Sequence, residues 1–489
     1  MSDNELLQPP ITQLGAATDL AGAVADATDE GEVDLLVVDA SHLGDLASVG
    51  IDVPDGAAAL LSVDAGLVEL ARPEGSRRVA RVVGVADPQD REALRHLGAR
   101  IGRAGAGKDR VVVAVAAVDL RPLVEGLVLG GYRSARRGPR GPVPGLVPAG
   151  STVLVTDGVA FDPEPVATVT RASLVARNLA NTPSNVKDPQ WMVDRASEVA
   201  REHDLQIRVW DEEELQAEGF GGLLAVGGGS VRPPRLVQLD YGTKGDFPHV
   251  VLVGKGITFD TGGINVKPAE GMVSMRTDMS GSAVVLAVLD AVAHLGLAVH
   301  LSVLLPLAEN AFGASSYRPS DVITPYGGRR TIEVTNTDAE GRIVLAAALA
   351  YADERLDPDV LIDVATLTGA ARVALARSMA ALFTGDDDLA LELTEAGATS
   401  GEPLWRLPLH EDYREYLRSD VADLDNAPGK AGAVTAALFL QEFVGDRRWA
   451  HLDIAGPGRS DDDTGLLSIG ATGYGARTLL TWLEQPEGI

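Results

Sequence analysis

Short apolar runs alternate with helical patterns in the first third of the chain. The runs with strand character are 33–40, 79–86, 110–118 and 151–158, and the helical patterns are 90–102 and 120–133. Strands that alternate with helices indicate a mostly parallel α/β sheet. The Pro- and Gly-rich stretch 138–150 cannot hold a helix, because each Pro removes a donor and clashes with the preceding turn, so it predicts a surface loop.

A long helical pattern at 163–181 leads into a second and stronger series. Its strands are expected at 237–241, 250–256, 298–308, 331–335, 360–367 and 449–456, and its helices at 279–295, from 341 onward, and at 431–444. Near-continuous apolar strands indicate a sheet covered on both faces. We therefore predict an α/β protein with a smaller N-terminal α/β domain, residues 1–170, and a larger C-terminal α/β domain, residues 171–489, in which helices cover a mixed sheet. Chemistry in such sheets collects where strands end and loops begin.

Charge and composition exclude several classes of function. The chain has 70 acidic and 42 basic residues, a formal net charge of −28, and 0 cysteines. This charge repels phosphate backbones and anionic lipids, so nucleic acid is an unfavourable partner. Without cysteine there are no disulfides, no thiolate metal ligands and no cysteine nucleophile, and any metal must be held by oxygen or nitrogen.

Neither a secretory signal nor a membrane span is expected. The chain begins Met-Ser-Asp-Asn-Glu, which is acidic where a signal needs basic residues. The longest apolar region, 283–308, is interrupted by Asp290, His294, His300 and Pro306, so no uninterrupted membrane helix fits there. These features favour a cytoplasmic protein.

Charged residues gather after the apolar strand 250–256. Lys255, Asp260, Lys267 and Asp278 lie on or just after this strand and before the next helix. Burying such charges unpaired is costly, so acids clustered beside glycines are a candidate metal site. The alternative for a lone Asp-Thr-Gly-Gly loop is a solvated acidic turn.

A second acidic cluster follows the strand at 331–335. Asp338, Glu340 and Arg342 lie just before an apolar helix. Positions i and i+2 diverge on a helix, so both acids converge only from an irregular turn. A helix cap would account for one of the two acids, but it would not account for the second acid and the arginine as well. Together the clusters supply three Asp and one Glu, more carboxylates than one catalytic ion normally takes, and therefore favour a site with two divalent ions. Such two-metal sites activate a water, which is the chemistry of hydrolysis.

These segments resemble the leucyl aminopeptidases, also called cytosol aminopeptidases, of the M17 metallopeptidase family. The resemblance is carried by VGKGITFDTGG from Val253, NTDAEGR from Asn336 and DVATLTGA from Asp363, with further blocks over most of 176–489. It implies a dinuclear metallo-exopeptidase that releases leucine-like N-terminal residues from short peptides. The N-terminal domain resembles the family only loosely, and is implied to serve oligomerisation and the shape of an interior cavity in a homohexamer.

The resemblance also implies roles for individual residues. It implies metal ligands at Lys255, Asp260, Asp278, Asp338 and Glu340, with Asp260 and Glu340 bridging two Mn²⁺ or Zn²⁺ ions. A hydroxide that also bridges the ions is the implied nucleophile. An ammonium has no lone pair, so Lys255 must be deprotonated to ligate. Lys267 is implied to polarise the scissile carbonyl, and Arg342 to hold a bicarbonate ion. The implied substrate cleft is lined by Met275, Thr366, Leu367, Gly369 and Ala455.

Four positions depart from the family pattern. Ser280 and Ser282 add hydroxyls near the site, where they could simply cap the helix. Ala347 stands where the family commonly has an Asp, so an outer carboxylate is expected to be missing. Gly458 replaces a bulkier residue, which is expected to leave room for a larger substrate side chain.

Other interpretations of the sequence stay open. A second Asp-Thr-Gly at Asp463 allows an aspartic protease dyad, but its surroundings are polar and charged. The glycine-rich turns at 227–229 and 254–256 lack a phosphate-binding context, and His451 is interpreted as a core histidine. A DNA-binding relative without activity is disfavoured by the net charge, and a specialised dipeptidase or processing peptidase would share the same site chemistry.

Overall fold

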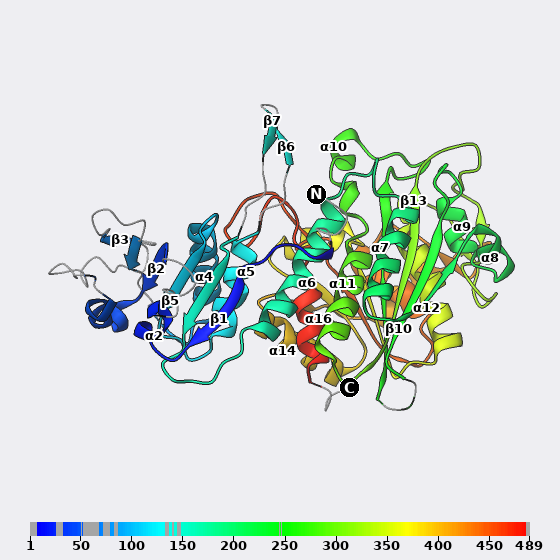
Figure 1. The fold of residues 1–489 in the computed structure, drawn as a ribbon. Coiled ribbons are helices and arrows are strands. Elements are labelled where there is room, and N and C mark those ends of the chain that lie inside the picture. Colours follow the sequence, from blue (N-terminus) through cyan, green and yellow to red (C-terminus); the bar gives the residue numbers. More distant parts are fainter. Residues whose placement is uncertain are drawn as a thin grey trace. The chain divides into compact units, whose positions relative to one another are not determined.

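The computed structural model describes residues 7–25, 33–49, 51, 68–71, 79–82, 87–132, 136–138, 141–143, 148–243, 245 and 247–485. The chain divides into two compact units (Figure 1). The first contains Met1–Leu174 together with a returning segment, Asp462–Ile469, and the second contains Val175–Asp461 and Gly470–Ile489. Each unit is α/β, so the predicted fold class is confirmed.

The first unit is built on a six-stranded sheet of order β1-β8-β5-β2-β4-β3. These strands are β1 Gln13–Ala17, β8 Ser151–Val155, β5 Arg110–Ala114, β2 Leu35–Val38, β4 Val79–Val82 and β3 Val68–Ala71. All neighbours pair parallel except β3 and β4, which agrees with the predicted mostly parallel layer. The helical elements are α2 Leu20–Ala25, η1 Ala40–Val49, α4 Arg91–Gly105, α5 Arg121–Gly130 and the first part of α6 Glu164–Asn181.

The predicted loop at 138–150 is partly wrong. A short antiparallel hairpin, β6 Arg136–Gly138 with β7 Gly141–Val143, overlaps it. Pro142 pairs with Arg137 in a hairpin of only two strands. Proline is tolerated in such a ribbon because its missing N–H can face away from the partner strand. Residues 83–86 of the strand expected at 79–86, and 139–140 and 144–147 of this loop, lie outside the described residues.

The returning segment 462–469 completes the first unit. Asp463 forms an ion pair with Arg103 on α4. Leu466 packs against a small core that contains Val128, Leu129 and Tyr132. The first unit is therefore assembled from two stretches of chain that are far apart in sequence.

Helices α4 and α5 pack with their backbones in direct contact. A Cβ added at Gly98 would fall on the carbonyl oxygen of Leu123, and one added at Gly126 would fall on that of Arg95. Gly102 and Gly130 make equivalent approaches one turn further along. Glycine is required here because no side chain fits between the two helices.

The second unit contains a nine-stranded mixed sheet of order β18-β17-β20-β16-β11-β13-β10-β9, with β12 beside β13. Its strands are β9 Gln206–Trp210, β10 Arg235–Tyr241, β11 His249–Gly254, β12 Gly256–Asp260, β13 His300–Asn310, β16 Val360–Ala365, β17 Ala380–Phe383, β18 Leu404–Arg406 and β20 Arg448–Asp453. The central strands β13, β11, β16 and β20 are parallel, whereas β9, β10 and β17 join antiparallel. The carboxyl ends of the central strands therefore meet at one edge of the sheet.

Helices cover both faces of this sheet. They are α7 Pro189–Glu202, α8 Glu212–Ala217, α9 Gly221–Gly227, α11 Ser280–Leu295, α12 Gly341–Tyr351, α13 Gly369–Leu375, α14 Asp387–Ser400, α15 Gly432–Gln441 and α16 Ala476–Leu483. Val251 and Val253 share a core with α9, α12 and α15. Val250 and Leu252 are equally buried and, by strand alternation, face the other side, where α11 packs.

Most predicted elements of the second unit are confirmed. Strands β11, β13, β16 and β20 and helices α11, α12 and α15 lie where the pattern places them. The strand expected at 331–335 is shorter, since only β15 Ile332–Glu333 forms, between β14 Val322–Ile323 and β19 Leu424–Asp425. A last short hairpin pairs β21 Arg459–Ser460 with β22 Gly470–Ala471.

Among the described residues, one helical stretch, Ala269–Leu295, is long and apolar enough to cross a membrane. It consists of α10 Ala269–Met272, the 3₁₀ turn η3 Met275–Thr277 and α11. Within its most apolar window, 78% is buried inside the protein. Packing in the core therefore accounts for its apolar composition.

The contact between α4 and α5 leads to a stability prediction. Gly126→Ala is expected to lower the free energy of unfolding by about 2 kcal/mol or more, because the methyl group forces the helices apart. Gly44→Ala is the control, since a Cβ there meets nothing within 4 Å, and its effect should stay within about 0.5 kcal/mol. Thermal and denaturant unfolding measure both. Equal stability of the two variants would contradict the proposed tight packing.

Candidate metal centre

The acidic residues singled out in the sequence lie at the carboxyl edge of the central sheet. Lys255 follows β11 directly, and Asp260 is the last residue of β12. Asp278 lies between η3 and α11, and Glu340 immediately precedes α12. Adjacent parallel strands thus deliver residues from distant parts of the sequence to one place.

Three of these carboxylates converge. Asp260, Asp278 and Glu340 are buried, and each offers an oxygen within 4.8 Å of the others'. The other oxygen of Glu340, Oε2, is buried without a hydrogen-bond partner among the described residues. Buried carboxylates this close repel one another and require cations. The donor set is therefore well suited to a divalent metal.

Two lysines occupy this cluster. Lys255 Nζ lies 2.9 Å from Asp278 Oδ2 and 2.9 Å from Glu340 Oε1. Lys267 Nζ lies 2.8 Å from Asp260 Oδ2 and also pairs with Asp338. Asp338 is half-buried, so it sits at the more open side of the cluster. The seven charged residues predicted for the site include these six, and all six are brought together.

The pKa values of the cluster reflect competition between burial and charge. Burial, reinforced by Glu340 and Asp278, raises the pKa of Asp260 well above its ordinary value. Burial likewise raises the pKa of Asp278 to about 6, although Lys255 opposes this. Burial alone would lower the pKa of Lys255, but the facing carboxylates outweigh it and raise that pKa. Each lysine therefore acts here as a counter-charge.

Glycines make room for Lys255. A Cβ at Gly341, the first residue of α12, would lie 2.5 Å from Lys255 Cε and 2.6 Å from Nζ. A Cβ at Gly281 on α11 would lie 2.7 Å from Lys255 N. The first turns of both helices therefore approach the lysine as closely as their backbones permit.

The residues that support Asp260 were not among those predicted. Asn310, at the end of β13, donates from Nδ2 to Asp260 Oδ1 (2.8 Å) and to the carbonyl of Thr337 (3.0 Å). Tyr317 Oη donates to the same carbonyl at 2.6 Å. These bonds tie the Asp260 loop to the turn that carries Asp338 and Glu340. An amide ending an apolar strand was the only available signal.

Arg342 lies in the first turn of α12 and is buried. Its Nε has no hydrogen-bond partner among the described residues. Burial lowers its pKa to about 10, against the opposing charges of Glu340, Asp453 and Asp425. The guanidinium therefore stays charged at neutral pH and has a donor to offer to an anion.

The residues expected to line the substrate cleft lie mostly in the loops that follow the strands β16 and β20. Thr366 and Leu367 lie between β16 and α13, Gly369 opens α13, and Ala455 follows β20. Met275 opens η3, which leads to Asp278. Thr366 contacts the cluster directly, because its Oγ1 donates to Asp278 Oδ1 at 2.8 Å.

The departures from the family pattern have structural explanations. Ser280 Oγ donates to the carbonyl of Thr277 (2.6 Å) and Ser282 Oγ to that of Gly254 (2.7 Å), so both hydroxyls serve the backbone. Ala347 is fully buried within an apolar core. A Cβ at Gly458 would lie 2.6 Å from the carbonyl oxygen of Ile454. Gly458 therefore allows a close backbone approach, and this contact accounts for the glycine without reference to pocket size.

The aspartic protease interpretation receives no structural support, and His451 has the setting of a core residue. Asp463 is exposed and paired with Arg103, so it has the solvated setting expected of a loop. His451 is fully buried and its Nδ1 lies 2.6 Å from Asp363 Oδ1, as expected for a core histidine.

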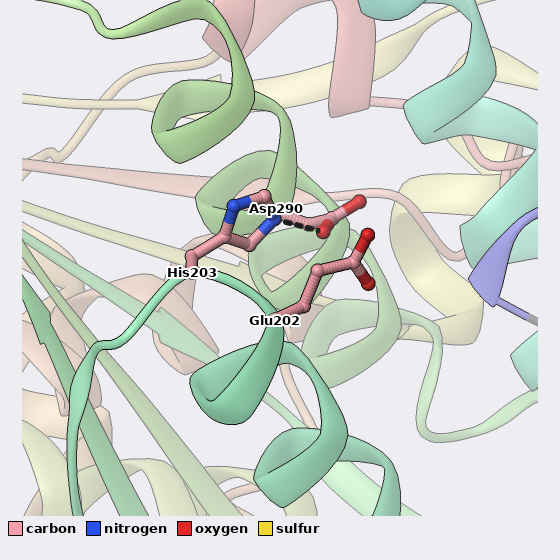
Figure 2. A group of neighbouring side chains, drawn as sticks. All are labelled: Glu202, His203 and Asp290. Atoms are coloured by element: carbon pink, nitrogen blue, oxygen red, sulfur yellow. Dashed lines mark hydrogen bonds and ion pairs between the residues drawn. The ribbon is translucent and has the colours of Figure 1, made fainter.

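A second group with metal-ligating side chains contains Glu202, His203 and Asp290 (Figure 2). His203 Nε2 and Asp290 Oδ1 are 2.8 Å apart, while Glu202 is exposed. Asp290 lies ten residues beyond the start of α11, about 15 Å along the helix at 1.5 Å per residue. The pair of His203 and Asp290 therefore connects the end of α7 to α11, away from the carboxylate cluster.

Comparison with known proteins identifies the family. The catalytic-domain model of the cytosol aminopeptidase family matches residues 174–480. The chain belongs to this family. A probable cytosol aminopeptidase of Syntrophotalea carbinolica is 46% identical over 372 residues, 74% of each chain. That of Leifsonia xyli subsp. xyli is 41% identical over 444 residues, 86% of this chain and 88% of the relative.

Solved structures show the same fold. The bottromycin maturation enzyme BotP in complex with Mn matches with a TM-score of 0.80 and 34% identity, over 92% of this chain and 99% of that one. The cytosol aminopeptidase from Coxiella burnetii matches with a TM-score of 0.80 and 33% identity, over 96% and 99%. The predicted family and activity are confirmed: this protein is a metal-dependent aminopeptidase, a hydrolase of peptide substrates.

Gly341 provides a test of the centre. Gly341→Ala is expected to lower kcat/KM for a leucyl anilide by at least about tenfold, because the new methyl group displaces Lys255, and such changes typically cost 10-fold to 100-fold. Gly385→Ala is the control, since a Cβ there meets nothing within 4 Å. Equal activity of the two variants, with metal content unchanged, would show that the position of Lys255 does not matter.

Proposed function

We propose that the centre holds two divalent ions, Mn²⁺ or Zn²⁺, through Lys255, Asp260, Asp278, Asp338 and Glu340. The observation that carries the proposal is the convergence of three buried carboxylates whose oxygens lie within 4.8 Å of one another. Three Asp and one Glu exceed what one catalytic ion normally takes. The similarity to an enzyme whose structure contains Mn is consistent with this metal class.

Lys255 is expected to change its protonation state when cations arrive. Its ammonium is favoured by the negative charge of Asp278 and Glu340. With divalent ions bound, that negative charge would be offset and the neutral amine favoured, so Lys255 would hold an ion as a neutral ligand. Burial, which by itself lowers the pKa of Lys255, works in the same direction.

The remaining residues bind and stabilise the reacting groups. When bound, the ions supply Lewis-acid polarisation and activate a water for attack on the first peptide bond. Lys267, which pairs with Asp260 and Asp338, would donate from its ammonium to the substrate oxygen as that oxygen gains negative charge. Arg342 would hold bicarbonate through its guanidinium, and a bound bicarbonate would supply a proton acceptor beside the centre.

The proposed substrates are short peptides with a free amino end and an apolar, leucine-like first residue. Met275 and Ala455 lie beside the first side chain, and Thr366, Leu367 and Gly369 line the rest of the cleft. Met tolerates varied apolar shapes. A specialised processing peptidase is the second candidate, favoured by the 34% identity to BotP, a maturation enzyme.

Residues 1–170 are proposed to serve assembly of a homohexamer whose active sites face an interior cavity. A cytoplasmic location is proposed from the relatives, which are named cytosol aminopeptidases. Binding of nucleic acid is not proposed, because a net charge of −28 repels phosphates.

Metal removal tests the centre. Chelator-treated protein should lose hydrolysis of a leucyl anilide, and Mn²⁺ or Zn²⁺ should restore it. Asp338→Ala should keep less than about 1% of the restored activity, because outer residues alone cost up to about 100-fold. Asp388→Ala, an exposed acid on α14, is the matched control. Full activity without metal, or in Asp338→Ala, would refute the proposed centre.

Bicarbonate dependence tests Arg342. In carbonate-free buffer, added bicarbonate should raise kcat of the wild-type enzyme, because the anion accepts a proton that Arg342 itself cannot accept. Arg342→Lys should lose most of this stimulation, since a point charge cannot bind a planar anion through two parallel bonds. Equal stimulation of the variant and the wild type would remove Arg342 from this role.

A further inference from the structure

We propose that Asp453 is a positioning residue that fixes two walls of the substrate cleft. The inference rests on the proposed function, because the loops after β16 and β20 line the cleft only if that assignment is right. Asp453 is the last residue of β20 and is 1% exposed. It was not among the residues that the sequence pointed to.

One carboxylate receives four hydrogen bonds from these two loops. Asp453 Oδ1 accepts from Leu367 N (3.2 Å) and from Ala455 N (3.0 Å). Oδ2 accepts from Thr368 N (3.1 Å) and from Thr368 Oγ1 (2.6 Å). Hydrogen bonds to an ionised acceptor are stronger than neutral ones, and these offset part of the cost of burying the charge, although burial on balance still raises the pKa of Asp453.

The Asp453 side chain accepts hydrogen bonds just beyond the end of the pairing between β16 and β20. Strands β16 and β20 pair in parallel as far as Ala365 and Asp453. Ile454 N still donates to the carbonyl of Ala365 (2.8 Å), which is the last backbone hydrogen bond between these two segments among the described residues. Beyond it, the backbone N–H groups of both loops have no facing strand. Asp453 supplies the acceptors that a longer ladder would have supplied.

The loop after β16 is thereby held from two sides. Thr366 Oγ1 donates to Asp278 Oδ1 (2.8 Å), and the carbonyl of Thr366 accepts from Lys255 Nζ (3.2 Å). On the other side, Leu367 and Thr368 are bound to Asp453. Thr368 Oγ1 also accepts from Ala371 N (3.0 Å), which caps α13. Asp453 therefore sets the position of the cleft wall relative to the metal centre.

Asp453→Asn tests this role with almost no change in volume. In either orientation, the new NH₂ group faces backbone N–H donors, Thr368 N in one and Leu367 N with Ala455 N in the other. We expect KM for a leucyl anilide to rise about tenfold and kcat to change less than about threefold, because cleft walls contribute mainly to uniform binding. Metal stoichiometry of the holoenzyme should stay unchanged.

Asp363→Asn is the matched control. Asp363 is equally buried on the adjacent strand β16, and accepts from Trp449 Nε1 (2.9 Å) and pairs with His451 Nδ1 (2.6 Å). This variant also replaces a buried carboxylate by an amide without touching either loop, and the amide can still accept from Trp449 Nε1 and donate to Nδ1 of a neutral His451, so the variant should keep its KM. A KM of Asp453→Asn within about twofold of the wild type, or an equal rise in both variants, would overturn the inference.

A second pair of variants applies if Asp453→Asn does not fold. Thr368→Val removes the hydroxyl bond to Asp453 Oδ2 together with the cap bond from Ala371 N, and should raise KM about threefold, whereas Thr368→Ser should restore the wild-type value. Unchanged KM in Thr368→Val would overturn the inference. Wild-type protein that fails to hydrolyse any leucyl substrate with either metal would instead overturn the proposed function, so the two failures are distinguishable.

Discussion

The need to neutralise three buried carboxylates at one edge of a sheet determines the architecture of the second unit. Asp260, Asp278 and Glu340 come from three separate segments and cannot approach without cations among them. One of the two lysines that satisfy this need, Lys255, is closely approached by glycines at the starts of α11 and α12. The close packing of these helix ends against β11, and the bonds from Asn310 to the neighbouring loop, both maintain that concentration of charge.

Much of this site could be predicted from the sequence because parallel strands end at the same edge. Lys255, Asp260, Asp278 and Glu340 each follow an apolar strand or precede an apolar helix, so their meeting place and the acidic character of the site were visible. The role of Lys255 as a ligand was implied only by the family resemblance. The strands β11, β13, β16 and β20 were equally clear, since burial on both faces requires uninterrupted apolar runs. The boundaries of short strands such as β15 were not, because two residues carry no detectable periodicity.

The supporting contacts could not be predicted, because they depend on how elements are placed in three dimensions. Asn310 reaches Asp260 only because β12 lies beside β13 with a shift in register between Ile257 and Asp260. Asp453 lies in a mostly apolar run that does not mark it, and three of its four hydrogen bonds come from residues 85 or 86 positions away, in the loop after β16. The serines near α11 could have faced either the site or the backbone, and only the fold decides between the two.

The returning segment 462–469 has a consequence for how the two units are inherited. The first unit is not a simple N-terminal appendage, because Asp463 and Leu466 reach it from within the catalytic sequence. A chimera that joins residues 1–174 of one homologue to the rest of another would therefore take most of the first unit from one parent and the returning segment 462–469 from the other. Recombination at that single junction divides the first compact unit between two parents. A successful chimera therefore requires that the returning segment fit the N-terminal stretch it packs against.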